Sequence, residues 1–191
     1  ASSHERRTRA GESLRRIMQH MLFASRPRGT LFQALQGAMA RCGRRHGLLE
    51  DMRQIELDYG DILKMTLALG RMTTRLAAPG ERIGLLLPNL AATLGLMIGS
   101  GAFGRVPAML NYTAGRQGIE SACRVAGIKT LISSRAFIET ARLQEVIAAL
   151  PESLNVLYLE DLRAAFTWQD KLWVLAALCL PRLLVPTQRS E

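Results

Sequence analysis

The chain has 191 residues, of which 48% are hydrophobic and 21% charged, a composition that supplies the core of one globular domain and excludes a chain that is disordered throughout. Its formal net charge of +9 is unevenly spread, because seven arginines and only two glutamates fall in the first 28 residues. Such a basic flank can meet phosphate on a membrane surface or on nucleic acid, or it can be a solvated face.

The first element that we expect is an amphipathic helix over residues 11–24. Arg15 and Arg16 lie on its basic side, so the helix can contact an anionic membrane surface, although most amphipathic helices dock on their own protein. Pro27 and Gly29 then indicate a hinge. The opposite, apolar side of the helix carries five residues at helical spacing: Leu14, Ile17, Met18, Met21 and Leu22.

Three further elements are expected before the first buried strand. Thr30 is the expected N-cap of a second helix, which ends near Gly43. Two short stretches after it, 48–52 and 54–58, predict a hairpin. A third helix is expected over residues 59–76, where apolar residues recur at helical spacing before a Pro-Gly pair.

Four short apolar runs then recur about every two dozen residues, separated by helical patterns. This alternation is typical of βαβ units, so we expect an α/β fold with a parallel sheet flanked by helices. The expected strands lie within residues 81–89, 106–110, 129–132 and 154–159. The expected helices after the first three strands and at the end of the chain cover residues 90–103, 116–126, 136–150 and 168–184.

Polar residues follow these strands at the edge where open parallel sheets bind their ligands, beyond the carboxyl ends of the strands. We therefore expect any site to lie along this edge. The residues in question are Pro88-Asn89, Asn111-Tyr112-Thr113, Ser133-Ser134 and Glu160-Asp161.

Two spacings in the chain match motifs of nucleotide or lipid chemistry. Gly99, Gly101 and Gly104 match the dinucleotide fingerprint, but they close an expected helix instead of opening one, which predicts helix packing and a C-cap. A nucleotide-binding domain built on them is the least favoured alternative.

His46 and Asp51 have the His-x4-Asp spacing of glycerolipid acyltransferases, yet the accompanying Pro-Glu-Gly-Thr block is missing, so we expect His46 to be a surface loop residue.

Other signals of chemistry are weak. Cys42, Cys123 and Cys179 lie far apart in apolar stretches, so we expect buried free thiols and no metal site. The longest apolar run, 172–180, falls short of the ~20 residues that a transmembrane helix needs. The sequence contains no phosphate loop, nucleophile elbow or carboxylate pair, and we expect no catalytic, cofactor-binding or metal-binding residue in it.

Several stretches carry a family resemblance. Residues 58–63 (Asp-Tyr-Gly-Asp-Ile-Leu) and 79–89 (Pro-Gly-Glu-Arg-Ile-Gly-Leu-Leu-Leu-Pro-Asn) resemble the N-terminal part of the acyl-adenylate-forming, or AMP-binding, synthetases. A narrower resemblance over about residues 30–186 is to the synthetase half of the bifunctional 2-acylglycerophosphoethanolamine acyltransferase/acyl-(acyl-carrier-protein) synthetases. It is carried by residues 105–115 (Arg-Val-Pro-Ala-Met-Leu-Asn-Tyr-Thr-Ala-Gly), 128–135 and 158–162.

This resemblance implies an enzyme that activates a fatty acid with ATP and Mg²⁺ as acyl-adenylate and passes the acyl group to acyl carrier protein. It also implies reacylation of lysophosphatidylethanolamine (2-acylglycerophosphoethanolamine) at the cytoplasmic face of the bacterial inner membrane. Residues 1–29 would be a basic amphipathic helix and linker that follow an acyltransferase domain. Residues 30–191 would be the first subdomain of the adenylation domain, cut before its phosphate loop.

On the same resemblance, the chain by itself is expected to be catalytically inactive and to hold no cofactor, since the residues for ATP, Mg²⁺ and acyl transfer would lie outside it. Asn89, Asn111 and Tyr112 are the residues that we expect in the wall of the acyl tunnel. The chain also begins without an initiator methionine, so we expect it to belong to a longer protein and, with apolar surface left exposed, to self-associate.

A function of another class stays open. The chain could be a small α/β binding module whose basic arm docks on anionic lipid or nucleic acid. Salt-dependent binding that is lost on removal of residues 1–29 would favour this reading. We expect no nucleic-acid partner, because the aromatic residues that stack on bases are missing from the basic flank.

Overall fold

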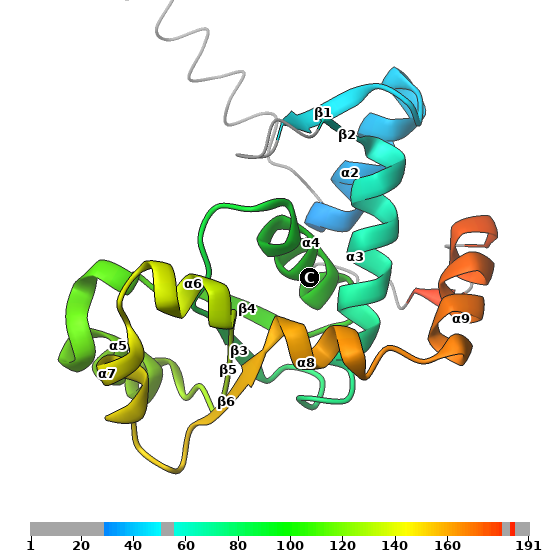
Figure 1. The fold of residues 1–191 in the computed structure, drawn as a ribbon. Coiled ribbons are helices and arrows are strands. Elements are labelled where there is room, and N and C mark those ends of the chain that lie inside the picture. The colour runs from blue at the N-terminus through cyan, green and yellow to red at the C-terminus, as the bar shows by residue number, and fades with distance from the viewer. Residues whose placement is uncertain (1–28, 51–55, 181–183, 186–191) are drawn as a thin grey trace, which may run out of the picture. The chain divides into compact units, whose positions relative to one another are not determined.

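The computed structural model describes residues 29–50, 56–180 and 184–185 (Figure 1). The chain divides into two units at Gly29 and Thr30, and the elements below all belong to the unit that begins at Thr30. The amphipathic helix expected over residues 11–24 lies outside the described residues. The domain boundaries expected from the family resemblance stay a prediction.

A four-stranded, fully parallel sheet forms the centre of this unit, in the order β4-β3-β5-β6. On the central strand β3, Leu85 lies opposite Met109 of β4 on one side and Ile132 of β5 on the other. The expected α/β fold with a parallel sheet flanked by helices is confirmed. The strands are β3 (Arg82–Leu85), β4 (Val106–Met109), β5 (Thr130–Ser133) and β6 (Asn155–Tyr158).

The helices connect these strands in the doubly wound manner. The chain leaves β3 toward one edge of the sheet through α4, and then crosses back through α5 to place β5 on the other side of β3. The topological switch point therefore lies between the carboxyl ends of β3 and β5. The connecting elements are α4 (Ala91–Ala102), the 3₁₀ turn η1 (Tyr112–Ala114), α5 (Gly115–Ala126), α6 (Arg135–Thr140), α7 (Gln144–Ala148) and, after β6, α8 (Leu159–Ala164).

One expected helix is split. We predicted a single helix over residues 136–150, but α6 ends at Thr140 and α7 begins at Gln144. Arg142 between them has a φ of 54°, a left-handed conformation that a continuous right-handed helix excludes.

Successive side chains along each strand point to opposite faces of the sheet, and apolar side chains pack on both faces. Ile83 and Leu85, both 0% exposed, point to the side of α3 and α4, where they pack in one core cluster with Leu96. Leu86 and Leu131 point to the opposite side, which α5, α6 and α7 cover (Figure 1). Because both faces are covered, the strands read as nearly continuous apolar runs, which is why they were visible in the sequence.

The elements before the sheet form as their local signals predict. Thr30 caps α2 (Leu31–Cys42) in a capping box with Gln33. The expected hairpin is present as β1 (Gly47–Glu50) and β2 (Glu56–Asp58), which pair antiparallel. Asp58 then caps α3 (Tyr59–Thr73) by accepting a hydrogen bond from the Asp61 amide at 2.8 Å.

Glycines allow α3 and α4 to pack closely. A Cβ added at Gly99 would lie 2.5 Å from the Thr66 carbonyl oxygen and 2.8 Å from the Gly70 nitrogen, whereas one added at Gly101 would meet nothing within 4 Å. Gly104 follows the helix with a φ of 76°. The glycines that match the dinucleotide fingerprint therefore serve helix packing and helix termination, as predicted, although Gly101 takes no part in the packing.

The last helix, α9 (Trp168–Cys179), packs on α3 through a buried carboxylate. Asp170 is fully buried; its Oδ1 accepts hydrogen bonds from Arg71 Nε at 2.8 Å and from Arg75 Nη2 at 2.6 Å. The same carboxylate closes a capping box with Thr167. The centre of the Trp173 ring lies 4.5 Å from the Arg71 guanidinium. The ion pair, the helix cap and this cation–π contact therefore all hold the start of α9 against α3. The helix ends five residues before the expected residue 184.

Two details of the sequence analysis have different outcomes. His46 is exposed in the turn before β1 and stacks on Tyr59 with ring centroids 6.2 Å apart, which confirms it as a surface loop residue; Asp51 lies outside the described residues.

All three cysteines are free thiols, but only Cys123 is buried. The expected burial was wrong for Cys42 and Cys179, because both are the last residues of helices and face away from the core.

Candidate functional site

A cavity of about 250 Å³ lies beside the carboxyl ends of β3 and β4. The first turns of α4 form one wall, because Leu90, Leu94 and Met97 are spaced to share one side of the helix. Met109 closes the cavity from the end of β4 and Leu49 from β1. Asn89 and Thr93 complete the lining.

Local sequence explains where this wall begins. Pro88 cannot donate a backbone hydrogen bond and follows the last apolar residues of the β3 region, so the chain turns there into α4. Thr93 Oγ1 donates a hydrogen bond of 2.7 Å to the Pro88 carbonyl oxygen, which ties the turn to the helix. The Thr93 hydroxyl is thus already engaged, and Asn89 supplies the exposed amide at the cavity.

The lining defines what the cavity can do. The described residues of the lining are three leucines, two methionines, one asparagine and one threonine, and none of these is ionisable. Such a surface suits an apolar group better than a charged one, and flexible methionine side chains adapt to the shape of what they contact. These seven described residues offer no group for acid-base catalysis.

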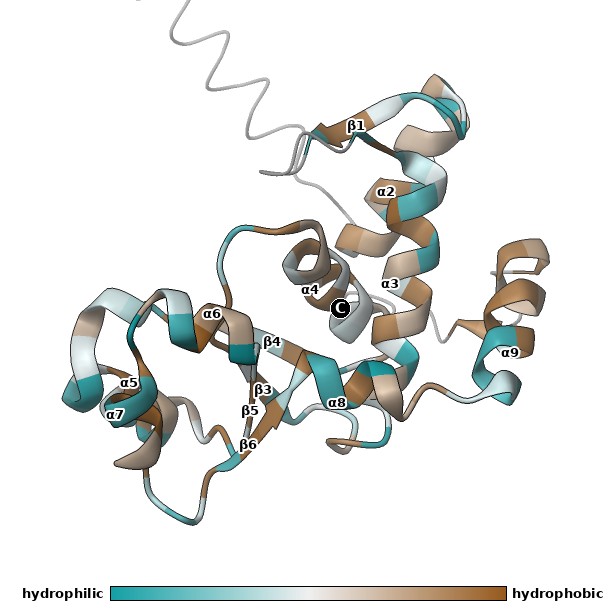
Figure 2. Ribbon diagram, viewed as in Figure 1, coloured by the Kyte–Doolittle hydropathy of each residue, from teal (hydrophilic) through white to brown (hydrophobic). Residues whose placement is uncertain are grey.

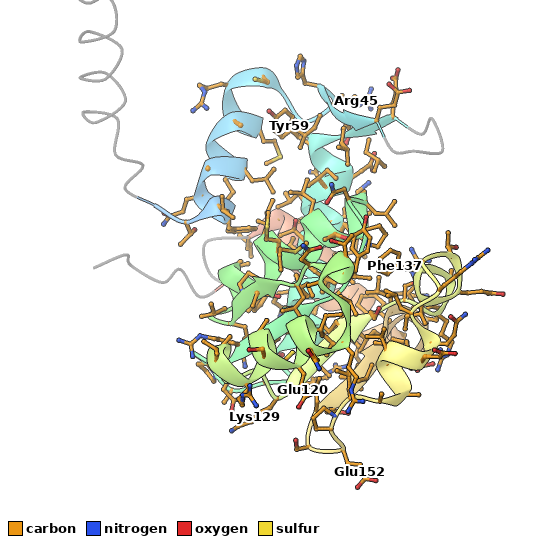
Figure 3. All side chains as sticks on the ribbon, turned by 90° about the vertical axis from the view of Figure 1, so that its left-hand side faces the viewer. Arg45, Tyr59, Glu120, Lys129, Phe137 and Glu152 are labelled. Atoms are coloured by element: carbon orange, nitrogen blue, oxygen red, sulfur yellow. The ribbon has the colours of Figure 1, made fainter. Side chains whose placement is uncertain are left out.

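The three residues expected in a tunnel wall do not share one position. Asn89 lines the cavity, whereas Asn111 and Tyr112 lie past the end of β4, outside the cavity lining. Asn111 Oδ1 accepts hydrogen bonds from the Thr113 nitrogen at 3.0 Å and from its hydroxyl at 2.8 Å, which caps η1. The Tyr112 ring packs edge-on against Phe137 of α6, labelled in Figure 3, with ring centroids 5.2 Å apart. Their part in ligand binding stays a prediction.

Sequence reasoning missed most of the lining. The stripe of Leu90, Leu94 and Met97 could have been found from its helical spacing, once the position of the sheet edge was assumed. No local signal could identify Leu49 or Met109, because each reaches the cavity from another element of the fold.

At the carboxyl ends of β5 and β6, the polar side chains form hydrogen bonds with one another. Arg135 pairs with both carboxylate oxygens of Asp161, at 2.8 and 2.7 Å, and its guanidinium lies 4.4 Å from the centre of the Tyr158 ring. The hydrogen bonds from Arg135 lower the pKa of Asp161 below its ordinary value. Glu160 Oε1 accepts hydrogen bonds from the Ser134 hydroxyl and the Arg135 nitrogen. Burial alone would raise the pKa of Glu160, but hydrogen bonds from its own backbone nitrogen, from the Ser134 hydroxyl and from the Arg135 nitrogen lower it.

This network joins α6 to α8, although Glu160 Oε2 is buried without a hydrogen-bond partner. Ser133 adds a hydrogen bond of 2.7 Å from its hydroxyl to the Leu86 carbonyl oxygen, across the topological switch point from β5 to β3. Among the described residues, no group of three or more His, Cys, Asp or Glu is placed to hold a metal ion. The part of the chain that the structure describes also contains no helix with the length and apolar character needed to cross a membrane.

No family model matches the chain. Among solved structures, the inhibitor-bound N-terminal domain of FACL13 from Mycobacterium tuberculosis aligns with a TM-score of 0.61 and 18% identity, over 71% of this chain and 35% of that one. VinN in complex with 3-methylaspartate aligns with a TM-score of 0.60 and 21% identity, over 85% of this chain and 41% of that one.

The N-terminal subdomain of Klebsiella oxytoca NpsA, solved with 3-hydroxybenzoyl-AMSN, aligns with a TM-score of 0.58 and 18% identity, over 74% of this chain and 33% of that one. NpsA also appears in an artificial adenylation-PCP fusion that aligns with this chain. The chain thus has the fold of the N-terminal subdomain of adenylate-forming enzymes, and it spans between about a third and two fifths of the length of these three structures.

Proposed function

We propose that this chain is the first subdomain of an enzyme that activates a fatty acid with ATP as acyl-adenylate, and that its cavity binds part of the acyl chain. The observation that carries the proposal is the apolar cavity at the carboxyl edge of the sheet, within a fold shared with N-terminal subdomains of adenylate-forming enzymes. An uncharged cavity lined by leucine and methionine suits an alkyl chain better than a polar or ionic substrate.

The proposal assigns this chain a binding role. Leu94, Met97 and Met109 would contact methylene groups, and the Asn89 amide would lie at the exposed side of the cavity. Asn111 and Tyr112 are proposed to extend the wall beyond β4. The ligands of Mg²⁺ and of the ATP phosphates are proposed to lie outside this chain, and we derive no chemical step through them.

The finer proposal is a bifunctional enzyme of phospholipid remodelling. It would pass the acyl group to acyl carrier protein and reacylate lysophosphatidylethanolamine at the cytoplasmic face of the bacterial inner membrane. The support is the resemblance over residues 105–115, which build β4 and η1 and place Met109 at the cavity. The acyltransferase reaction itself would belong to a domain outside this chain.

Fatty-acid-dependent ATP–pyrophosphate exchange tests the proposal, measured in parallel on the 191-residue chain and on the longer protein of which we propose it is a part. We expect exchange by the longer protein and none by the chain alone. Exchange by the chain itself would mean that it contains its own phosphate site. Absence of exchange from both would contradict the proposal and favour a binding module with a basic arm.

Filling the cavity should change which fatty acids the longer protein activates. A Met97→Trp variant should lower kcat/KM for long-chain fatty acids about tenfold, and that for short-chain acids much less, because a pocket discriminates by the methylenes it can accept. Met97→Leu, which preserves volume and apolar character, is the matched control and should retain the original preference. An equal loss for all chain lengths would show that the cavity does not hold the acyl chain.

A further inference from the structure

The parallel sheet has two outer edges, one along β4 and one along β6 (Figure 1). Successive residues of a strand direct their backbone N–H and C=O groups alternately to its two sides. On β4 the Val106 nitrogen donates a hydrogen bond of 2.9 Å to the Glu81 oxygen, so Val106 is directed toward β3. By this alternation Pro107 and Met109 direct their backbone groups away from the sheet.

The outer edge of β4 is closed to a further strand. Pro107 has no N–H group, so the middle of this edge offers no hydrogen-bond donor. Proline within a sheet is confined to edge strands, strand starts and bulges, and it is one of the devices by which proteins prevent an edge from pairing. Within β4, the Met109 N–H is left as the outward donor. We therefore expect β4 to remain an edge of the sheet.

The outer edge of β6 is open. The Asn155 nitrogen donates a hydrogen bond of 2.8 Å to the Lys129 oxygen, so Asn155 is directed toward β5 and the next residue, Val156, is directed outward. The same alternation directs Leu157 toward β5 and Tyr158 outward. Among the described residues, no backbone group pairs with the Val156 N–H, the Val156 carbonyl or the Tyr158 N–H.

The usual devices that protect an edge are missing from β6. Its sequence, Asn-Val-Leu-Tyr, contains no proline and no charged side chain, and the strand is largely apolar (Figure 2). Its register with β5 runs from Asn155 to Tyr158 without a bulge. It has four residues, as each of the other three strands has, so it is not shortened relative to its neighbours. An unprotected edge of this kind is a template for a further strand.

The geometry of this edge selects its partner. An extended polypeptide presents N–H and C=O groups at the spacing of the free groups on β6, which is how strand addition works. A second copy of the chain is a poor partner, because a stable interface uses about 20–30 residues a side and β6 has four. A strand tethered to the same protein needs no such area, since the tether holds it at a high effective concentration. In the solved structures of this fold, 65% of the FACL13 domain and 59% of VinN lie outside the part that this chain covers.

We propose that a further strand of the longer protein pairs with the outer edge of β6, while β4 stays an edge of the sheet. The strand would bond to the N–H and C=O groups of Val156 and to the N–H group of Tyr158. The proposal rests on the proposed function only in the premise that this chain belongs to a longer protein. It concerns neither the cavity nor the adenylation reaction.

Residue-resolved amide hydrogen exchange tests this directly, measured on the 191-residue chain and on the longer protein. The Val156 and Tyr158 amides should exchange at least about a hundredfold more slowly in the longer protein, because they become hydrogen-bonded there. The Leu157 amide, which is directed toward β5, should be protected in both proteins. The Met109 amide is the matched control, since it faces outward on the closed edge and should gain much less protection.

Two proline variants of neighbouring residues separate the outer side of β6 from its inner side. Val156→Pro removes an outward N–H group, so it should leave the thermal midpoint of the 191-residue chain nearly unchanged but lower that of the longer protein. Leu157→Pro removes an N–H group that is directed toward β5, so it should lower the midpoint of both proteins by roughly 5–10 °C. If either variant fails to fold, the exchange measurement on the original proteins still decides the question.

Three results would overturn the proposal. The first is equally fast exchange of the Val156 and Tyr158 amides in both proteins. The second is equal added protection of Met109, since general burial would then explain the change. The third is protection in the 191-residue chain that disappears on dilution, because a second copy would then be the partner. Fatty-acid-dependent ATP–pyrophosphate exchange by the longer protein without protection of β6 would contradict this inference alone, and protection without that exchange would contradict the proposed function alone.

Discussion

An Asp170→Asn variant should lose about 3 kcal/mol of unfolding free energy. Removing one partner of a buried ion pair costs about 3–5 kcal/mol, because the remaining charges lose their counter-ion. Arg71 and Arg75 keep 28% and 45% of their side-chain exposure, and this contact with water places the expected loss at the lower end of that range. Urea denaturation followed by circular dichroism measures the change.

Asp61→Asn is the matched control for this variant. Asp61 pairs with Lys64 on the exposed side of α3 at 3.1 Å, and both side chains are largely in water. Exposed pairs at this spacing contribute little, so this variant should change the free energy of unfolding by no more than about 0.5 kcal/mol. Equal effects of the two substitutions would contradict the role assigned to Asp170.

The pH dependence of stability should identify the same carboxylate. Burial alone would raise the pKa of Asp170, but hydrogen bonds from Arg71, Thr167 and Arg75 lower it far below the ordinary value of 3.8. A group with a depressed pKa in the folded state stabilises the fold above its unfolded pKa, and this contribution is lost as pH falls toward the folded pKa. Below about pH 4 the original chain should therefore lose stability more steeply than Asp170→Asn, so that the difference between them narrows. A difference that stays constant down to pH 2 would exclude this carboxylate as the cause.

A Gly99→Ala variant should lose about 3 kcal/mol of unfolding free energy, the upper part of the usual range for overpacking. The added Cβ would lie 2.5 Å from the Thr66 carbonyl oxygen, and backbone atoms of a packed helix cannot move aside as a side-chain end can. To relieve this contact, α3 and α4 must separate, which opens the core cluster between them. Urea denaturation with comparison of m-values detects the loss.

Gly101→Ala is the control two residues away in the same helix. Its Cβ would meet nothing within 4 Å, so alanine should be neutral or stabilise the helix by up to about 1 kcal/mol through its higher helix propensity. The pair also tests the dinucleotide interpretation of this segment, which assigns importance to Gly101. A large loss from Gly101→Ala with little from Gly99→Ala would contradict the packing described above.

The outcomes along the sheet show which inferences sequence alone supports. The strands were recognisable because both faces of the sheet are covered, so each strand is a short apolar run such as Ile83 to Leu87. The cap at Thr30 was recognisable because it acts on an amide three residues away. The break at Arg142 was not, since no residue type there demands a left-handed conformation.

The candidate site was predictable only in its location. The carboxyl edge of the sheet follows from the order of strands and helices, and Asn89 lines the cavity at this edge, while its part in ligand binding stays a prediction. Asn111 and Tyr112 were assigned to the same wall by their position after β4, but Asn111 caps η1 and Tyr112 packs on Phe137. A position at the end of a strand does not determine which neighbour a side chain contacts.

The sequence by itself determined the strands, most of the helices and the parallel α/β arrangement, because these depend on periodicity and on residues a few positions apart. Tertiary structure alone decided the contents of the cavity, the burial of Asp170 and the exposure of Trp168, Leu172 and Leu175 on α9. Asp170 meets Arg71 and Arg75 across 99 and 95 positions of the chain, and Leu49 meets Met109 only at the cavity. Such contacts arise from packing between distant elements, which leaves no local pattern in the sequence.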